Sequence, residues 1–222
     1  MPISKVYNID CMEYMCSIPD GFFDLAIVDP PYGIADNPSR HGGRGAGKLK
    51  NRVLNANAAK FKSWDIPPKK EYFNELFRVS KHQIIWGGNY FDLPPTRCFI
   101  CWDKVQPWEN FSQVEFAWTS FNYPAKIFKY DNRNGGKIHP TQKPIELYSF
   151  LLKTFSKCGD KVLDTHLGSG SSRIAAYKLE IDFYGCEIDK DYFDSMEERF
   201  RRECLGENKL RNGKTVKQLN LF

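Results

Sequence analysis

A tetrapeptide of unusual composition follows an apolar stretch near the start of the chain. Residues 25–28, Leu-Ala-Ile-Val, have the composition of a buried strand, and Asp29, Pro30, Pro31 and Tyr32 come directly after them. Each proline fixes its own φ and restricts the residue before it, so the Asp29 carboxylate and the neighbouring carbonyl oxygens form a rigid cluster of acceptors. Such a cluster can hold an amino group by its hydrogens, and the Tyr32 ring offers a face on which a planar base can stack.

This arrangement suits chemistry on the exocyclic amine of adenine or cytosine. The lone pair of such an amine is delocalised into the ring, which makes the nitrogen a poor nucleophile. Acceptors that hold its hydrogens draw the nitrogen toward tetrahedral geometry and stabilise the positive charge that develops on it. On this interpretation Asp29 is a hydrogen-bond acceptor and does not need to be a strong base.

A second stretch, KVLDTHLGSGSSRIAAYKLEIDFYGCEID at residues 161–189, has the pattern of a nucleotide- or nucleoside-binding unit. It predicts a strand that ends at Asp164 and a turn through Gly168, Ser169 and Gly170. A helix is then expected to start at Ser171 or Ser172, and a second strand to end in the acid Glu187. Glycines let a ligand approach the main chain, the helix start offers amides, and the acid can bind two ribose hydroxyls. A tight turn without a ligand is the alternative. The missing third glycine and the absence of GKS or GKT argue against dinucleotides and ATP.

Length and composition limit the class of protein. The 222 residues, with 41% hydrophobic and 15% aromatic side chains, predict one globular domain. No stretch resembles a signal peptide or approaches the roughly 18 apolar residues of a membrane span, so we expect a cytoplasmic protein with no membrane contact. The seven cysteines do not form a disulfide framework. Cys98 and Cys101 lie in an apolar run without a second pair, which favours core packing over zinc, and no metal site is predicted.

Strand-like and helix-like segments alternate along the chain. This alternation predicts an α/β fold, a doubly wound and mostly parallel sheet with helices on both faces. We expect strands at 24–28, 83–88, 97–102, 114–119, 125–130, 161–164 and one ending at residue 187, and helices at 67–80, 144–160, 171–179 and 189–204. The alternating apolar and polar residues of 114–119 and 125–130 indicate antiparallel strands. Gly159 is expected to end its helix, and the chain after Gly206 to be unpacked until its last five residues.

Positive charge is concentrated in one segment. The chain carries a net charge of +5, while residues 37–64 contain no acid and seven basic side chains, so the remainder has a net charge of −2 (5 − 7): Arg40, Arg44, Lys48, Lys50, Arg52, Lys60 and Lys62. A solvated surface loop could have this composition. The position of the segment just after Asp29–Tyr32 favours contact with a polyanion.

Taken together, these motifs resemble those of DNA amino-methyltransferases that use S-adenosyl-L-methionine and make N6-methyladenine, enzymes of bacterial or phage DNA modification and restriction–modification. The resemblance runs from KVYNIDCMEYM at residues 5–15 to the helix ending near residue 204. DPPY at 29–32 matches the catalytic motif and HPTQKP at 139–144 the segment that helps to hold the methionine moiety. The resemblance implies a Rossmann-like class I methyltransferase fold and a cofactor site formed by Asp10, Asp29, His139, Thr141, Gln142, Lys143, Asp164, His166, Gly168, Ser169, Gly170, Ser171 and Glu187.

Within that site the resemblance gives two acids a specific role. Glu187 resembles the acid that binds the ribose, and Asp10 the acid that meets the adenine amine of the cofactor. The chain departs from the family pattern, which commonly has a DPF-type start and a threonine after the second glycine, because Thr165, His166 and Ser171 stand at those places. His166 either lines the cofactor pocket or fills the space of the usual aromatic residue.

The order of the motifs, catalytic first and cofactor loop last, resembles the permuted β group of these enzymes. It implies a methyltransferase domain at 1–205 with a basic lid loop at 34–64 that binds double-stranded DNA, a target-recognition insertion at 105–138, and a flexible tail at 206–222. Five aromatic residues of the insertion could stack on bases or belong to the core: Trp108, Phe111, Trp118, Phe121 and Tyr123. An insertion of this size offers a small surface for recognising DNA, which implies a short recognised site or help from a second subunit. The protein is therefore expected to be a monomer or a homodimer.

Alternatives remain at this stage. Asp29 in place of a serine favours adenine, with N4-cytosine methylation as the nearest alternative. A catalytically idle module that binds nucleic acid or a sliding clamp is a further alternative, against which the intact DPPY argues.

The final QLNLF resembles the peptide by which bacterial replication proteins bind the sliding clamp, through Gln218, Leu219, Leu221 and Phe222. A tail folded back on its own domain is the other interpretation.

Overall fold

The computed structural model describes residues 1–34, 65–107, 112–131, 138–139, 141–209 and 215–217. Within these ranges eight strands form one sheet in the order β1-β8-β7-β2-β3-β5-β4-β6. Their bounds are β1 (Ser4–Tyr7), β2 (Phe23–Val28), β3 (Ser80–Trp86), β4 (Phe99–Asp103), β5 (Val114–Thr119), β6 (Lys126–Lys129), β7 (Lys161–Asp164) and β8 (Asp182–Cys186). In the sheet, the neighbouring strands β1, β8, β7, β2 and β3 are all parallel, and β5 runs antiparallel to its neighbours β3 and β4.

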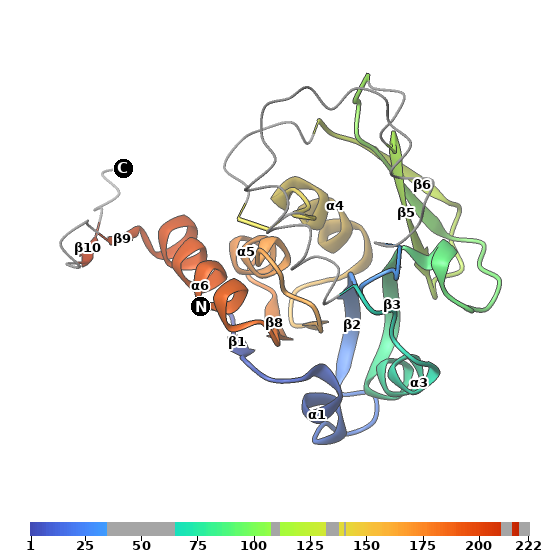
Figure 1. The fold of residues 1–222 in the computed structure, drawn as a ribbon, viewed down its shortest axis with the longest axis horizontal. Coiled ribbons are helices and arrows are strands. Elements are labelled where there is room, and N and C mark those ends of the chain that lie inside the picture. The colour runs from blue at the N-terminus through green and yellow to red at the C-terminus, as the bar shows by residue number, and fades with distance from the viewer. Residues whose placement is uncertain (35–64, 108–111, 132–137, 140, 210–214, 218–222) are drawn as a thin grey trace, which may run out of the picture.

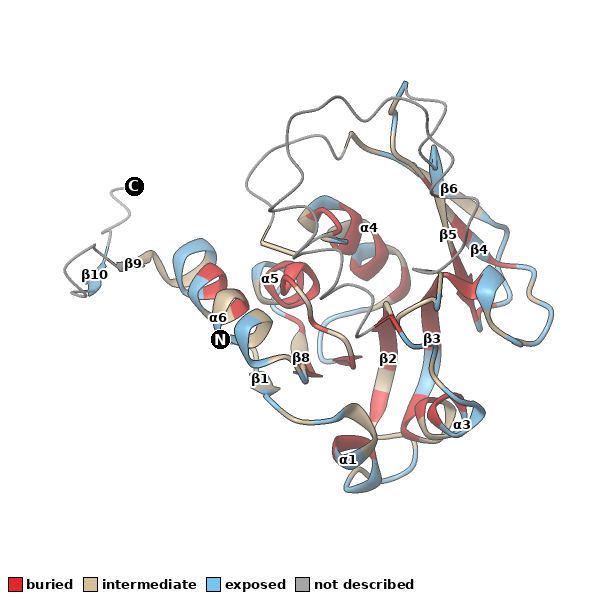
Figure 2. Cartoon of the chain, viewed as in Figure 1, coloured by how far each residue is buried: buried red, intermediate tan, exposed pale blue. Residues whose placement is uncertain are grey.

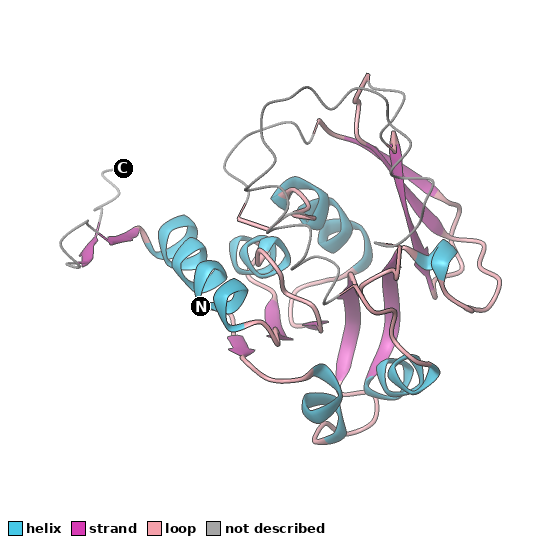
Figure 3. Ribbon diagram, viewed as in Figure 1, coloured by secondary structure: helices cyan, strands magenta, loops and turns pink. Residues whose placement is uncertain are grey.

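Helices cover both faces of the sheet (Figures 1 and 3). They are α1 (Cys11–Cys16), α3 (Lys70–Val79), α4 (Ile145–Phe155), α5 (Ser171–Lys178) and α6 (Lys190–Leu205), with a 3-10 turn, η2 (Gly88–Tyr90). Successive residues of β2 serve opposite faces, because side chains alternate along a strand. Leu25 and Ile27 join the core cluster that contains residues of α4, α5 and α6, whereas Ala26 and Val28 join the cluster of α1 and α3. The predicted doubly wound α/β fold is confirmed.

Burial follows from this layering. Strand β2 is enclosed on both faces, with Leu25, Ala26, Ile27 and Val28 at most 1% exposed. Figure 2 shows buried residues along β2 and β3 and on the sides of the helices that face the sheet. A strand covered on both sides needs a continuous apolar run, and this is why residues 25–28 contain no polar residue.

The chain changes its winding direction between β7 and β2. From β2 it passes through α3 to β3 on one side, and from β7 through α5 to β8 on the other. In doubly wound sheets ligands bind at such a switch point, beyond the carboxyl ends of the strands. Leu25 and Ala26 pair in parallel with Val162 and Leu163, so the residues that follow the two strands leave the sheet at the same edge.

Two local expectations are wrong. Helix α4 ends at Phe155, where the amide and hydroxyl of Ser156 donate to the Leu152 carbonyl, and Gly159 lies in the turn beyond. Strand β6 runs parallel to β4. Strand β5 ends beside the start of β4, and the short connection 120–125 brings the chain to the other edge of β4 at that same end, which fixes the parallel direction.

Two short strands are described beyond α6. Gly206, with φ +67°, ends the helix, and β9 (Glu207–Lys209) pairs antiparallel with β10 (Thr215–Lys217). This small sheet lies beyond α6, away from the main sheet (Figure 1). The two strands were not predicted from the sequence, and all three residues of β10 are exposed. In the described ranges, helices long and apolar enough to cross a membrane are absent.

Candidate active site

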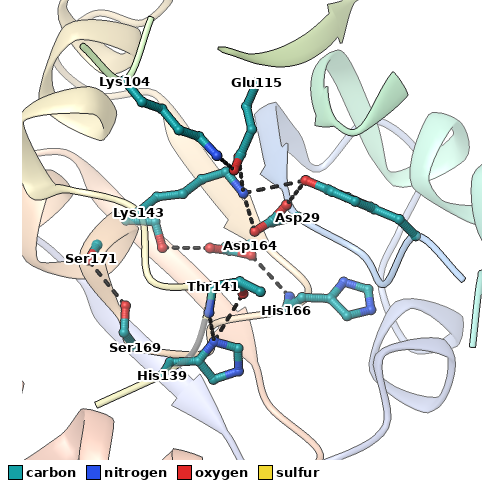
Figure 4. A network of polar contacts seen from close by, with 12 residues as sticks. Asp29, Lys104, Glu115, His139, Thr141, Lys143, Asp164, His166, Ser169 and Ser171 are labelled. Atoms are coloured by element: carbon teal, nitrogen blue, oxygen red, sulfur yellow. Dashed lines mark hydrogen bonds and ion pairs between the residues drawn. The ribbon is translucent and has the colours of Figure 1, made fainter. Parts of the chain in front are cut away.

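The predicted catalytic residues lie where β2 ends at the switch point. The Tyr32 hydroxyl donates to Asp29 Oδ1 at 2.6 Å, and the Lys143 ammonium donates to Asp29 Oδ2 (Figure 4). Lys143 Nζ also lies 3.4 Å from the Tyr32 hydroxyl oxygen. Burial and the negative charge of Asp29 raise the pKa of the Tyr32 hydroxyl well above its ordinary value, so Tyr32 remains a hydrogen-bond donor at neutral pH.

Asp65 holds the backbone that follows the two prolines. Its Oδ1 accepts from the amides of Tyr32 and Gly33, both at 3.0 Å, and its Oδ2 from the amide of Ile34 at 2.8 Å. Hydrogen bonds from successive amides to one carboxylate fix the direction in which the chain leaves the strand. The contact with Ile34 joins residues 34 and 65, which lie on either side of the basic segment.

The loop after β3 supports the Tyr32 ring. Gly87 has φ +68°, and a Cβ at this position would come within 2.6 Å of three consecutive Tyr32 ring atoms, so the backbone lies over the face of that ring. Tyr90 stacks on Tyr32 with ring centroids 5.1 Å apart and an interplanar angle of 19°. Glycine is required at residue 87 by both its conformation and this close approach.

Lys143 does not extend toward the glycine turn. Its side chain is only 3% exposed and its ammonium lies between two carboxylates, Asp29 and Glu115, the latter at 3.2 Å. It also lies 5.1 Å from the centroid of the buried Trp86 ring. Burial alone would lower the pKa of Lys143, but the charges of Asp29 and Glu115 outweigh it and raise that pKa. Lys143, which was expected to bind the cofactor, thus contacts the carboxylate of Asp29, the predicted catalytic residue.

The strand β7 ends in a buried acid. Asp164 is 1% exposed and accepts from the Ser172 hydroxyl at 2.5 Å and from the His166 amide at 3.0 Å. Burial is the main cause that raises its pKa to about 7, and the negative charges of Asp29 and Glu187 act in the same direction. Asp29 follows β2 and Asp164 ends β7, and the parallel pairing of these two strands brings both acids to one edge of the sheet.

His166 is a packed and neutral residue. Its Nδ1 lies 2.9 Å from the Thr165 hydroxyl, which is itself 2.6 Å from the Tyr72 hydroxyl of α3, and its ring meets the Tyr72 ring edge to face. Burial lowers the pKa of His166 to about 4. These contacts favour the interpretation that His166 fills the space of an aromatic side chain.

Glu187 holds the glycine turn in place. Its Oε2 accepts from the Gly168 amide at 2.8 Å and its Oε1 from the Asp189 amide at 3.0 Å. Burial raises the pKa of Glu187, and these amides act against that rise. The turn itself follows prediction, since Gly168 and Gly170 have φ +48° and +70° and α5 begins at Ser171. The Arg199 guanidinium of α6 also contacts the turn, because it donates to the Ser169 carbonyl at 2.8 Å and to the Ser171 hydroxyl at 2.9 Å.

The HPTQKP segment reaches the same turn. A Cβ on Gly168 would lie 3.6 Å from the His139 ring, and that ring packs at 4.3 Å from the Tyr192 ring of α6. Thr141 donates from its amide to His139 Nδ1 at 3.3 Å, and Gln142 Oε1 accepts from the Ile138 amide at 3.1 Å. His139 therefore lies at the glycine turn and Lys143 at Asp29, so this segment contacts both motifs (Figure 4).

Asp10 has a structural task. It caps α1, where its Oδ1 accepts from the amides of Met12 at 2.8 Å and Glu13 at 3.3 Å. A cap explains an aspartate at this position without a ligand, and the predicted contact with an adenine amine stays a prediction.

The remaining predicted site residues lie in the core, at the surface or outside the described residues. Trp118 and Phe121 belong to the core and Tyr123 is 51% exposed. Strands β5 and β6, within the predicted insertion at 105–138, are part of the main sheet. Several predicted sites lie outside the described residues: the DNA-binding Arg40, Arg44, Lys48, Lys50, Arg52, Lys60 and Lys62, the aromatics Trp108 and Phe111, and the clamp-binding Gln218, Leu219, Leu221 and Phe222.

Comparison with known proteins agrees with this geometry. The chain is 24% identical to the Type II methyltransferase M.BglII of Bacillus subtilis over 97% of this chain and 74% of that protein. It is 23% identical to the Type II methyltransferase M2.MboI of Moraxella bovis over 88% of this chain and 87% of that protein.

Solved structures share the fold. The Thermus thermophilus protein TTHA0409, in complex with S-adenosyl-L-methionine, aligns with TM-score 0.58 and 19% identity over 92% of this chain and 96% of its own. The cytosine-N4-specific PvuII DNA methyltransferase aligns with TM-score 0.56 and 13% identity over 96% of this chain and 95% of its own. The family described as DNA methylase matches residues 68–198, more than half of the 222 residues. The chain therefore belongs to the DNA methylase family.

Proposed function

We propose that this protein transfers a methyl group from S-adenosyl-L-methionine to N6 of an adenine in DNA. The observation that carries the proposal is the meeting of two motifs at one switch point, Asp29–Tyr32 beyond β2 and the Asp164–Ser171 turn beyond β7. Because the two strands are adjacent and parallel, both motifs leave the sheet at its carboxyl edge, which supports a base-accepting site next to a donor site.

The residues around the turn fit a positively charged methyl donor. Asp164, Glu187 and Asp10 accept hydrogen bonds from hydroxyl and amide groups, and burial raises the pKa of the first two. A ligand that brings its own positive charge would offset the cost of burying these carboxylates. S-adenosylmethionine carries an ammonium and a sulfonium group, and when bound it supplies an activated methyl group.

The residues of the β2 side then act on the target base. A base within a duplex cannot reach a donor beyond the β7 edge, so it must leave the stack at a cost of a few kcal/mol. Gly87 and Tyr90 already lie against the Tyr32 ring, so the base stacks on this ring where Tyr90 gives way. Each oxygen of Asp29 can accept a further hydrogen bond besides those from Tyr32 and Lys143, which lets the carboxylate hold the amine hydrogens. Orientation and charge complementarity then supply most of the rate.

Adenine is the preferred target because position 29 carries an aspartate. N4-cytosine methylation is the second candidate, favoured by the shared fold with the cytosine-N4-specific PvuII enzyme. Incubation with labelled cofactor and plasmid DNA, followed by mass analysis of the nucleosides and sequencing of modified positions, separates the two. N6-methyladenine supports the proposal, and N4-methylcytosine moves it to the second candidate.

Two variants complete that experiment. Asp29→Ala should abolish methylation, whereas Asp20→Ala, at a side chain that is 81% exposed, should leave it unchanged. DNA binding without methyl transfer by the unaltered protein would instead identify an idle binding module.

The basic segment 37–62 is proposed to contact DNA phosphates, with support from its charge and from the contact of its flanking residues with Tyr32. Replacing Arg40, Arg44 and Lys48 by Glu should weaken DNA binding and flatten its dependence on salt. An unchanged affinity and salt slope would contradict this role.

The C-terminal QLNLF is proposed to bind a sliding clamp. Deletion of residues 218–222 should abolish retention on immobilised clamp and leave DNA methylation intact. Retention that survives the deletion would show that the peptide has another role.

A further inference from the structure

Glu115 is a residue that the catalytic motifs do not include, and yet it contacts their lysine. It lies on β5, opposite Trp102 of β4, and its Oε2 is 3.2 Å from Lys143 Nζ. Its Oε1 forms an ion pair with Lys104 Nζ at 2.5 Å. Figure 4 shows the two lysines on either side of this carboxylate, with Asp29 beyond Lys143.

Charges of opposite sign alternate along this chain of contacts: Lys104, Glu115, Lys143 and Asp29. The Lys143 side chain is 3% exposed, whereas those of Lys104, Glu115 and Asp29 are 20%, 27% and 15% exposed. The innermost cation is therefore the most desolvated, and a buried ammonium needs partners on more than one side. Glu115 supplies the second one.

The arrangement bears on the positive charge that develops on the target amine. Asp29 and Lys143 alone cancel each other's charge. Glu115 makes the sum of the three inner charges negative, and Lys104 lies at the far side of Glu115, where distance weakens its effect. Glu115 also competes for the Lys143 ammonium, which leaves Asp29 a stronger acceptor for the amine hydrogens.

We propose that Glu115 is a positioning residue for methyl transfer, which holds the Lys143 ammonium between itself and Asp29 and so ties strand β5 to the catalytic motif. This inference rests on the proposed function. Glu115 acts through Lys143 and touches neither donor nor base. Strand β5 is also the strand on which the predicted recognition region 105–138 enters the sheet.

The test compares Glu115→Gln with the unaltered full chain in single-turnover methylation at saturating S-adenosylmethionine and DNA. The variant keeps the shape of the side chain and removes its charge. We expect a rate lower by roughly 10- to 100-fold, the range for misplaced reacting groups, with affinities for cofactor and DNA within twofold. Glu115→Asp, which keeps the charge, should recover part of the rate.

A second measurement separates positioning from plain structural support. Titration of 13C-labelled lysine by NMR should show Lys143 losing its proton at a lower pH in Glu115→Gln, because one of the two carboxylates that raise the pKa of Lys143 is gone. The matched control is Asp103→Asn on the neighbouring β4. Asp103 pairs with the exposed Lys129 at 3.8 Å, and its variant should match the unaltered chain in both measurements.

Several outcomes would overturn the inference. One is a Glu115→Gln rate within twofold of the unaltered chain, and another is a rate loss in both Glu115 variants that follows a loss of cofactor affinity. If Glu115→Gln does not fold, Glu115→Ala takes its place, and a rate within twofold of the unaltered chain then overturns the inference. If the unaltered protein methylates no DNA, the proposed function fails, and the Lys143 titration still decides whether Glu115 controls that lysine.

Discussion

On the β2 side of the switch point, Asp29 belongs to a row of alternating lysines and carboxylates, whereas on the β7 side Asp164 accepts hydrogen bonds from a hydroxyl and a backbone amide. Both acids are largely buried. The first is neutralised by the protein itself, and the pKa of the second rises to about 7, mainly through burial.

The difference indicates what each side receives. A site that supplies its own cation suits a neutral guest, such as a nucleobase whose amine becomes positive only during the reaction. A site of acids held by neutral donors suits a guest that arrives positively charged. Under the proposed function, two neighbouring strands of one sheet would carry complementary halves of the transfer reaction.

The largest effect on the rate of methyl transfer, with little effect on cofactor affinity, is expected from Asp29→Asn. The new amide presents hydrogens where the target amine needs an acceptor, so the single-turnover rate should fall by roughly 10³-fold, as when a preorganised polar group is removed. The affinity for cofactor, measured by calorimetry, should stay within a few fold because Asp29 serves mainly the β2 side.

Asp164→Asn is the matched variant on the β7 side and should give the reverse pattern. The cofactor affinity should fall, while the rate at saturating cofactor stays close to that of the unaltered chain. If both variants lost affinity and rate alike, the two halves would not be separate.

A smaller effect, on stability, is expected at an acid of the β2 side that accepts hydrogen bonds from backbone amides. Asp65 lies on the β2 side and yet accepts from three backbone amides, those of Tyr32, Gly33 and Ile34. Asp65→Ala should lower the free energy of unfolding by about 3 kcal/mol, since hydrogen bonds to a charged group each contribute more than neutral ones. Urea denaturation measures it, and Asp92→Ala, at an exposed side chain, should change stability by less than about 0.5 kcal/mol.

The sequence predicts well those features that depend on one short segment. Strand β5 occupies the expected 114–119, and α5 begins at Ser171 because the glycine turn before it is specified by residues 168–170. The position of Asp29 and the glycine turn at one edge of the sheet also follows, since carboxyl ends of parallel strands share one edge.

Features that depend on pairing between distant segments could not be predicted. The contact of Glu115 with Lys143 requires knowledge of where β5 joins the sheet, and strand patterns do not encode that register. The direction of β6 was missed for the same reason. Strand β1 and helix α1 were missed because they have 4 and 6 residues, too few for a clear period.

The pH dependence of stability should reveal two groups that oppose each other. Between pH 4 and about 7 the folded protein keeps a proton on Asp164 that the unfolded chain has lost, so this group makes stability fall as pH rises. Between pH 4 and 6.5 the unfolded chain keeps a proton on His166 that the folded protein lacks, so this group makes stability rise with pH.

Removing either group should expose the other. In His166→Gln the free energy of unfolding should decrease with rising pH, relative to the unaltered chain, by up to about 1.4 kcal/mol per pH unit. In Asp164→Asn it should increase by a similar amount. Urea denaturation at pH 4.5, 5.5 and 6.5 measures both slopes, and parallel curves for all three proteins would show that neither group titrates as its burial implies.

The smallest expected effect concerns the link between the two faces of the sheet. The Tyr72 hydroxyl of α3 reaches Thr165 beside the cofactor loop at 2.6 Å, and both residues are buried. Tyr72→Phe removes one neutral hydrogen bond and should lower the free energy of unfolding by about 1 kcal/mol. Because Thr165 also contacts His166, the variant should weaken cofactor binding more than it slows transfer at saturating cofactor. A variant that slowed transfer and kept full cofactor affinity would place Thr165 with the β2 side of the site, against the division drawn between the two strands.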